Sequence, residues 1–540
     1  MNLERFLSHH GITENPFRAE EARHDPVFDR LIESRQWHPD FEKILGQIDC
    51  PSTSVIFGEK GSGKTAIRLQ MGRCVSKHNR KNPQRRTLLV AYDDLNPVLD
   101  RIVQRRSREM GFNRASRTSP EDLLERIRLE DHQDAILSLA VTKLNDAVLG
   151  VNPGAEDAVI LPDDSDKRIK RLPRRARVDW AILTALYDQP RSGTAAQRWA
   201  RMRSKLRLSW LLPGGRLTWS RIGATVLLVV AVVLLLARYV RPEHAGMFLA
   251  GSGLAGAGSL ILWGLWAWGH LRLWALCRRV HREMPSIERS VGDLRMMLLE
   301  LRAADRAAQP WPTPGISGGP EPGNRDSRFQ LTRRLLDVLG PLGYTGLLVL
   351  VDRVDEPQLV SGRAERMKPI IWPLLDNKFL QQEMVGIKLL LPIELRHLLR
   401  RESGDFFQEA RLDKQNLIDR LDWSGATLYD LCSSRLRACR DASIAGRREA
   451  PDPGGPDAGD DIQLTDLFEP GVTRDMLVES LDQMHQPRDA MKFLYSVVLE
   501  HCRNVPEDQA AFHIPRLVLD AVRRQQVQRV QEMQRGLSPA

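Results

Sequence analysis

The stretch TSVIFGEKGSGKT at residues 53–65 decides the fold. Residues 58–65 have the form G-x-x-x-x-G-K-[ST], and they follow a short β-branched run that is typical of a strand. The helical pattern AIRLQMGRCVSKH continues directly from Thr65. In a loop between a strand and a helix, glycines let successive backbone N–H groups turn toward phosphate oxygens. A purely structural glycine turn would not need the full motif in this context, so the stretch predicts a phosphate-binding loop.

The residue types within this loop predict Mg-ATP as its ligand. Lys64 is expected to reach the β and γ oxygens of the nucleotide, and the Thr65 hydroxyl is expected to bind Mg²⁺. ATP and GTP both fit such a loop, but no Asn-Lys-x-Asp run that would read a guanine base is evident. The predicted nucleotide contacts of the loop are Gly58, Gly61, Ser62, Gly63, Lys64 and Thr65.

A second acidic motif follows an apolar run much later in the chain, GLLVLVDRVDEP at 346–357. The run suits a strand buried on both faces of a parallel sheet, and Asp352 would lie at its carboxyl end, where such sheets bind ligands. We predict Asp352 as the second Mg²⁺ residue, on a strand adjacent to the phosphate loop. Glu356 or Asp355 would orient or deprotonate the attacking water. An acidic surface turn closed by Pro357 is the alternative interpretation.

Two further segments fit the same sheet. TLLVAY at 87–92 ends in Asp93-Asp94, and VGIKLLLP at 385–392 ends near Glu394. Strands of this kind joined by helical patterns predict an α/β fold with a parallel sheet.

Residues 411–438 carry apolar residues at helical spacing and predict the beginning of a helical lid. Arg420 and Arg435 lie in this block, and either could act as an arginine finger across a subunit interface. Such a finger would imply a nucleotide-dependent homo-oligomer. Most arginines on helices of this kind are merely solvated, which is the alternative.

Two uncharged apolar runs stand between the two nucleotide motifs, at 222–237 and 245–269. At about 1.5 Å per residue the second run crosses the roughly 30 Å hydrocarbon core of a bilayer. The first run reaches across it with Trp219 and Tyr239 at the two interfaces. Buried core helices are the alternative, but two such runs in tandem are unusual in soluble proteins. The runs predict a two-helix transmembrane hairpin with a tight turn.

Basic residues gather on both flanks of this hairpin and are scarce in its turn. Because Lys and Arg are retained on the cytoplasmic side, this pattern predicts a multi-pass protein of the cytoplasmic (inner) membrane with its ATPase in the cytoplasm. The same flanks would face membrane lipid. They are Arg198, Arg201, Arg203, Lys205, Arg207, Arg216 and Arg221 before the hairpin, Arg238 and Arg241 in its turn, and Arg272, Arg278, Arg279 and Arg282 after it.

Composition excludes several classes of protein. The chain has 540 residues, of which 27% are charged and 42% are hydrophobic, so it is not a polytopic transporter with most of its mass in lipid. Six cysteines without a C-x-x-C pair argue against a disulfide framework or a zinc ribbon. No cleavable secretory signal is expected at the N-terminus. The basic run KRIKRLPRRAR at 167–177 is interpreted as a solvated linker in preference to a nucleic-acid arm.

Membrane runs placed between two nucleotide motifs, with an acid pair shortly after Asp352, resemble the KAP P-loop ATPases, relatives of the STAND and AAA+ groups. The opening GITENPF at 11–17 resembles the AAA+ ATPases of type II secretion operons. QPRDA at 486–490 is similar to the second sensor of AAA+ lids, which implies that Arg488 contacts the γ-phosphate. A salt-bridged surface arginine is the alternative. Two motifs depart from the AAA+ pattern: Arg353 stands where a Glu would follow the Asp, and Pro392 and Glu394 stand where the first sensor would be Asn, Ser or Thr.

These motifs predict a membrane-anchored P-loop ATPase that binds and hydrolyses Mg-ATP, and the resemblance implies a regulatory or assembly switch with a protein partner. One alternative is an ATP-binding membrane scaffold or signalling protein with little turnover. The other is a membrane-associated DNA-binding ATPase, although nucleic acid is not the expected partner. The predicted units are an N-terminal segment (1–50), the first part of the nucleotide-binding core (51–112), a helical insertion with a basic linker (113–215), the transmembrane hairpin (216–275), a juxtamembrane helix and linker (276–324), the second part of the core (325–410), and a helical lid (411–540) with a disordered loop near 440–461.

Overall fold

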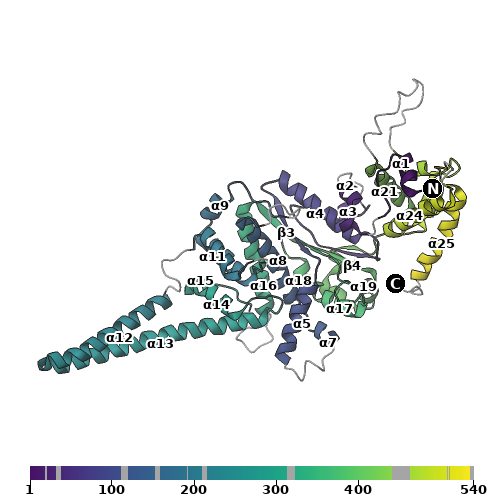
Figure 1. Cartoon of the computed structure of the whole chain (residues 1–540). Helices are drawn as coiled ribbons and strands as arrows, with labels where there is room; N and C mark the ends of the chain where they lie inside the picture. The colour runs from purple at the N-terminus through teal and green to yellow at the C-terminus, as the bar shows by residue number, and fades with distance from the viewer. Residues whose placement is uncertain are drawn as a thin grey trace.

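The computed structural model describes residues 1–18, 21–31, 38–110, 120–151, 158–190, 193–208, 216–312, 323–440, 462–506, 509 and 511–534. A body of helices around one β-sheet carries a long helical hairpin on one side and a helical unit on the other (Figure 1). The loop near 440–461 that the sequence predicts to be disordered lies outside the described residues, apart from Arg440.

Five parallel strands form the sheet, in the order β2-β3-β4-β1-β5. This confirms an α/β fold with a parallel sheet, and the order is compatible with a P-loop core. The expectation that the strand of Asp352 is adjacent to that of the phosphate loop is wrong, because β4 lies between β3 and β1. The strands are β1 (Ser54–Gly58), β2 (Arg86–Tyr92), β3 (Tyr344–Val351), β4 (Val385–Pro392) and β5 (Asn416–Ile418).

The central strands form because their sequences are continuous apolar runs that can be buried on both faces. In β3, Val349 packs into the largest core cluster, and the next residue, Leu350, packs into the cluster on the opposite face. Lys388 in β4 is the exception, since its fully buried Nζ donates to the Ser54 Oγ at 3.1 Å. Burial lowers the pKa of Lys388 to about 7.

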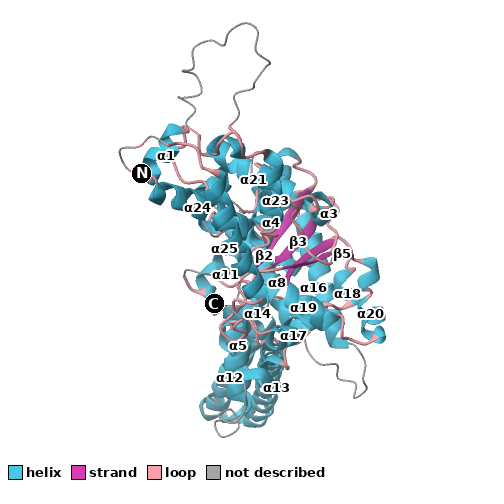
Figure 2. Cartoon of the chain, turned by 90° about the vertical axis from the view of Figure 1, so that its right-hand side faces the viewer, coloured by secondary structure: helices cyan, strands magenta, loops and turns pink. Residues whose placement is uncertain are grey.

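Helices cover both faces of the sheet (Figure 2). α3 and α4 cover one face, and α8, α10 and α16 contribute to the core on the other. α8 and α10 belong to the predicted insertion, yet their side chains, including the fully buried Trp180, share one core with the sheet. The bounds are α3 (Phe41–Leu45), α4 (Lys64–Lys81), α8 (Leu129–Leu149), α10 (Arg174–Tyr187) and α16 (Gly323–Leu339).

The basic segment at 167–177 is helical rather than a linker. It spans the end of α9 (Ser165–Arg171) and the first turn of α10. Arg168 pairs with Asp164 at 2.7 Å, and Arg174 pairs with Asp305 at 2.5 Å. Acidic partners thus neutralise part of the run, which disfavours a role as a nucleic-acid arm.

The helical prediction for 411–438 is wrong in its first half. β5 pairs with β1 in this region, and the helix α21 begins only at Gly425. Three residues are too few to show a strand pattern, and their conformation depends on the neighbouring strand β1.

The C-terminal helices form a unit with a hydrophobic core of its own, and the N-terminal residues pack into it. Phe6 and Ile12 lie in this core, and the Thr13 backbone N–H and hydroxyl both donate to the Cys439 carbonyl at 2.9 Å. The GITENPF segment is thus bound to the lid rather than to the sheet. The helices of the unit are α1 (Leu3–His9), α2 (Pro26–Leu31), α21 (Gly425–Ala438), α23 (Arg474–Asp482), α24 (Pro487–Asn504) and α25 (Arg516–Gln534).

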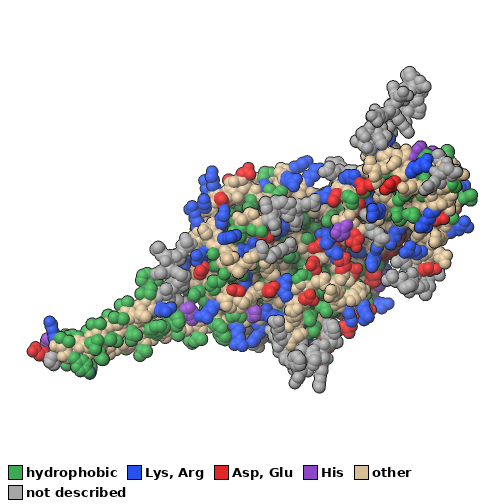
Figure 3. All heavy atoms as spheres, in the orientation of Figure 1, with side chains coloured by type: hydrophobic (Ala, Val, Ile, Leu, Met, Phe, Trp, Pro, Cys, Tyr) green, Lys and Arg blue, Asp and Glu red, His purple; other side chains and the backbone are tan. Residues whose placement is uncertain are grey.

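Two long apolar helices form the hairpin that projects from the body, joined by a short 3₁₀ turn at Pro242–His244. Their mean hydropathies are 2.4 and 1.6, and only 6% and 11% of their apolar windows are buried. Hydrophobic side chains cover the projecting part (Figure 3). The helices touch through small residues, since the Ser259 hydroxyl donates to the Ala224 carbonyl at 2.8 Å. They are α12 (Arg216–Val240) and α13 (Ala245–Glu283), and α13 continues without a break into the body.

The remaining helices connect these parts. They are α5 (Asn96–Met110), α7 (Pro120–Leu124), α11 (Ala195–Lys205), α14 (Val291–Leu299), α15 (Ala303–Ala307), α17 (Ala364–Ile371), α18 (Asn377–Leu380), α19 (Ile393–Leu399) and α20 (Gly404–Ala410), with short 3₁₀ turns at Ala22–His24, Gly340–Leu342, Trp372–Leu374, Leu412–Lys414 and Leu464–Leu467.

Candidate nucleotide site

The phosphate-loop motif joins β1 to α4 at the carboxyl edge of the sheet. Gly61 and Gly63 have φ angles of +99° and +92°, a conformation that residues with a Cβ rarely adopt. A Cβ on Gly58 would lie 2.4 Å from the Ser62 Oγ. The glycines of the motif are therefore required by this backbone, which leads directly into the amino end of α4, where N–H groups are available to an anion.

Lys64 folds back across the loop. Its Nζ donates to the carbonyl oxygens of Gly58 and Glu59 at 2.7 and 2.8 Å. Burial lowers the pKa of Lys64, and the carboxylates of Asp355 and Asp352 oppose that shift. A buried ammonium beside the amino end of α4 favours the binding of an anion at the loop.

The structure brings the two predicted Mg²⁺ residues together. The Thr65 hydroxyl, in the first turn of α4, donates to the Asp352 Oδ2 at 3.1 Å, although 287 positions separate them in the chain. Asp352 follows the last residue of β3 and is 1% exposed. Burial raises the pKa of Asp352, while Arg68, the Thr65 hydroxyl and Lys64 oppose that rise. Parallel strands end at one edge, so Asp352 reaches the loop even across the intervening β4.

Arg68 is a site residue that the sequence analysis did not identify. Its Nε lies 3.2 Å from the Asp352 Oδ2, and one terminal nitrogen lies 3.1 Å from the Asp93 Oδ2 at the end of β2. Arg23 also pairs with Asp93. The signal for Arg68 was its position one helical turn after Lys64, which places both side chains on one face of α4.

The two acids proposed to act on water lie differently. Glu356 is exposed, and its Oε1 accepts from the Arg353 Nε at 2.5 Å. Arg353 adopts a positive φ of 61°, which turns the backbone directly after Asp352. Asp355 is half-buried, and of the carboxylates near Lys64 it raises the pKa of the Lys64 ammonium most. Asp355 therefore acts on the Lys64 ammonium, whereas Glu356 is bound to Arg353 at the surface.

The lid packs directly on the phosphate loop. A Cβ on Gly61 would lie 2.9 Å from the Gln486 Oε1 and 3.0 Å from the Arg488 Cβ, at the amino end of α24. The Gln486 side-chain amide also donates to the Glu59 carboxylate, which forms an ion pair with Arg420 at 2.7 Å. Arg488, predicted to contact the γ-phosphate, thus lies beside the loop.

Trp423 and His38 extend this contact. The Trp423 indole N–H donates to the Ser62 carbonyl at 2.9 Å. The His38 ring packs edge-on against Trp423, and its Nδ1 accepts from the Asp40 backbone N–H at 3.1 Å. The other ring nitrogen therefore carries the proton and donates to the Asp422 carbonyl at 3.0 Å. Burial lowers the pKa of His38, in keeping with a neutral ring.

The two candidate arginine fingers have different surroundings. Arg435 is 1% exposed and forms an ion pair with Asp25 at 2.6 Å inside the C-terminal unit. A side chain held there does not reach a neighbouring subunit. Arg420 is partly exposed and is bound to the loop of its own chain through Glu59.

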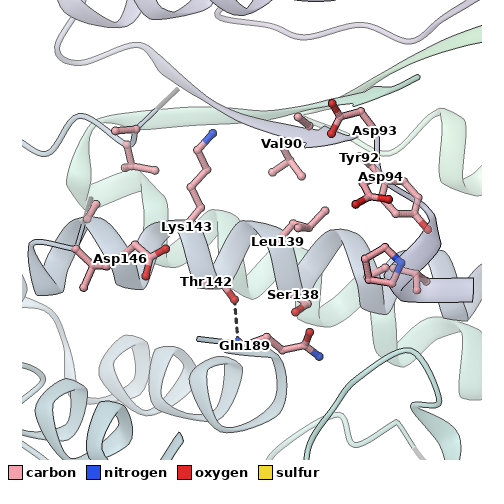
Figure 4. A pocket seen from close by; sticks show the side chains of 18 of the residues that line it. Val90, Tyr92, Asp93, Asp94, Ser138, Leu139, Thr142, Lys143, Asp146 and Gln189 are labelled. Atoms are coloured by element: carbon pink, nitrogen blue, oxygen red, sulfur yellow. Dashed lines mark hydrogen bonds between the residues drawn. The ribbon is translucent and has the colours of Figure 1, made fainter. Parts of the chain in front are cut away.

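A cleft of about 740 Å³ lies beside the site, between the end of β2, the start of α5 and one face of α8 (Figure 4). Arg68 and Asp93 line its end nearest the Mg²⁺ residues, and no residue of the phosphate-loop motif lines it. Lys143 points from α8 toward β2, where its Nζ donates to the Leu89 carbonyl at 2.9 Å. The Thr142 hydroxyl accepts from the Gln189 backbone N–H at 2.9 Å. This cleft was not predicted, because its walls come from separate parts of the chain.

Comparison with known proteins adds no relative. No protein-family model matches the chain, and neither the curated proteins nor the solved structures include a match. We therefore infer the function of this chain from the geometry of the site.

Proposed function

We propose that this chain is a membrane-anchored P-loop ATPase that binds and hydrolyses Mg-ATP. One observation carries the proposal: the Thr65 hydroxyl of the phosphate loop is hydrogen-bonded to Asp352 at the end of a different, non-adjacent strand. A structural glycine turn would not require a buried carboxylate at this position. The order of the strands and the helix that opens at Lys64 support the same assignment.

The side chains at this point fit a magnesium ion. Mg²⁺ prefers oxygen ligands and is usually held by one or two protein groups together with phosphate oxygens. The Thr65 hydroxyl and the Asp352 carboxylate supply such oxygens, and Asp352 already binds a cation in the form of the Arg68 guanidinium. When bound, the ion would neutralise charge on the β- and γ-phosphates.

The other residues of the site suit phosphoryl transfer to water. Lys64 would bind the terminal phosphate oxygens in place of the Gly58 and Glu59 carbonyls. Asp355, near Lys64, would orient the attacking water and accept its proton. Arg488 from the lid would add positive charge near the γ-phosphate.

The hairpin supports the membrane part of the proposal. α12 and α13 expose large apolar side chains, such as Val229 at 61% and Leu254 at 77%. Such a surface is unfavourable in water and is satisfied by lipid. The hairpin stands in the chain between Thr65 and Asp352, and this is the feature that resembles the KAP P-loop ATPases. A regulatory or assembly role is therefore part of the proposal, and the protein partner is not identified.

A second function, an ATP-binding membrane switch with little turnover, is favoured by two observations. Glu356 is bound to Arg353 and faces solvent, and Gln486 of the lid already contacts the loop. A site with this arrangement could bind nucleotide and change the contacts of its lid without rapid hydrolysis. The turnover rate of the purified chain separates the two functions.

The test of nucleotide binding uses two lysines of the same loop. In the detergent-solubilised full chain, Lys64→Ala is expected to abolish the binding of a fluorescent ATP analogue and all turnover, because it removes the ammonium nearest the phosphates. Lys60→Ala is the matched control: Lys60 is exposed and has no role in the motif, so binding should change by less than about twofold. Equal binding by wild type and Lys64→Ala would contradict the phosphate-loop assignment.

A further inference from the structure

We propose that Arg295, Arg306 and His270 form a binding site for the phosphate headgroup of an anionic phospholipid, where α13 leaves the apolar part of the hairpin. The proposal rests on the membrane placement proposed above. It adds to that placement a defined side-chain site, which differs from a general attraction of basic flanks to lipid.

The three side chains come from separate elements and converge. His270 is on α13, Arg295 is on α14, and Arg306 is on α15. A terminal nitrogen of Arg295 lies 3.1 Å from the His270 Nδ1, and because a guanidinium can only donate, the imidazole nitrogen accepts. Arg306 acts electrostatically on the same imidazole and is fixed by its NH1, which donates to the Leu298 carbonyl at 2.7 Å. One guanidinium group thus contacts the histidine, and a second is held on α14 at Leu298, one turn from Arg295.

This cluster has no acidic partner within the described residues. The nearby acids are engaged elsewhere: Glu300 pairs with Arg203 at 2.8 Å, and Asp305 pairs with Arg174. No carboxylate forms an ion pair with Arg295 or Arg306 in the described part of the chain, and both side chains are half-buried. Partly buried like charges repel each other and are poorly hydrated, so the arrangement favours a bound anion.

The position of the cluster identifies the source of that anion. His270 is the first residue with an ionisable side chain after the uncharged run 245–269 of α13. The Trp266 ring lies 4.5 Å from the His270 ring, and Trp266 belongs to a group of tryptophans of the kind found at membrane interfaces. With the apolar hairpin in the bilayer, the cluster therefore lies at the depth of the headgroups. Basic pockets beside transmembrane helices on the cytoplasmic side are suited to anionic headgroups.

A lipid also fits better than free phosphate, because the surroundings are apolar on the membrane side. Trp266 and Trp263 lie one and two turns before His270 on the same face of α13, and both are partly exposed. Acyl chains would cover these side chains while the phosphate diester contacts the two guanidinium groups. Free phosphate would satisfy the charges but leave the apolar surface uncovered.

The test compares two double variants of the full chain in nonionic detergent, with phosphatidylglycerol as the probe and native mass spectrometry as the measurement. Arg295→Gln with Arg306→Gln should lower phosphatidylglycerol binding about tenfold relative to wild type. Arg272→Gln with Arg279→Gln removes the same charge from exposed positions of α13 and should lower it less than about threefold. Arg295→Lys with Arg306→Lys should retain most of the binding, because both positive charges are kept at the same positions.

Three results would overturn the site: an equal loss in both glutamine pairs, no loss in either, or full competition by inorganic phosphate at millimolar concentration. Alkaline carbonate extraction of wild type separates this failure from that of the proposed function. A wild-type chain that stays in the membrane but shows one of these results disproves only the headgroup site. A chain that is extracted disproves the membrane placement as well.

Discussion

At the scale of single residues, the candidate site is organised around the cation that neutralises the Asp352 carboxylate. Arg68 contacts the Asp352 Oδ2 at 3.2 Å and the Asp93 Oδ2 at 3.1 Å, so a cation is already bound at the place proposed for Mg²⁺. Binding of the metal must therefore release one contact of Arg68, while the contact with Asp93 keeps the guanidinium close. The ends of β2, β3 and α4 are joined through this one side chain.

The two candidate acids can be separated by mutation. We expect Asp355→Asn to lower ATP turnover about a hundredfold or more with little effect on ATP binding. The reason is that, of the nearby carboxylates, Asp355 acts most strongly on the charge of Lys64. Glu356→Gln should lower it less than about fivefold, since Glu356 faces solvent and Arg353. Steady-state phosphate release with the two variants measures the difference. The reverse order would show that the loop after β3 rearranges when nucleotide binds.

At the scale of elements, β4 holds an ionisable group inside an apolar strand. Lys388 is 0% exposed, and its Nζ donates to the hydroxyls of Ser52 and Ser54 at 3.5 and 3.1 Å. No carboxylate among the described residues forms an ion pair with Lys388, and burial lowers its pKa to about 7 from the ordinary 10.5. The unfolded chain therefore binds a proton that the folded chain has lost between these two pH values.

This difference predicts a pH-dependent stability with a defined sign. Between pH 7 and pH 10 the Lys388 contribution should raise the free energy of unfolding by up to about 1.4 kcal/mol per pH unit, because only the unfolded state is protonated there. Lys388→Met should be more stable than wild type near pH 7, and the gap should narrow as pH rises. Thermal unfolding at several pH values gives the comparison, with Lys81→Met on the exposed end of α4 as the control. A gap that does not change with pH would contradict the buried, shifted lysine.

Local patterns predicted the elements better than their arrangement. Continuous apolar runs predicted β1, β3, β4 and both hairpin helices. A segment that is buried on every side has few polar residues, and this can be recognised from the sequence alone. The position of β4 between β1 and β3 left no such signal, since parallel pairing depends on tertiary contacts. The same reason explains why β5 and the Arg68 bridge were not predicted, whereas the resemblance to AAA+ lids had implied that Arg488 lies near the phosphate loop.

At the scale of the whole molecule, the hairpin and the nucleotide site constrain each other. Lys64 precedes the hairpin in the chain and Asp352 follows it, yet both belong to one site. An even number of membrane crossings between them is therefore necessary if the hairpin spans a bilayer. α13 continues into the body as one helix, and the Arg328 guanidinium, fully buried against Asp134, donates to the Glu283 carbonyl at its end at 2.8 Å. The stem of the hairpin is thus rigidly connected to the core that also contains the sheet.

This arrangement predicts that only the turn between α12 and α13 lies outside the cytoplasm. Val240 at this turn is 80% exposed, whereas the native Cys50 is exposed on the body. In intact cells an impermeant maleimide should label Val240→Cys and leave wild type unlabelled, and permeabilised cells should show labelling of Cys50 in both. The wild-type chain therefore serves as its own control, and no buried cysteine needs to be replaced. Labelling of wild type in intact cells would place the body outside, where ATP is scarce, and the absence of labelling at position 240 would show that the turn does not cross the membrane.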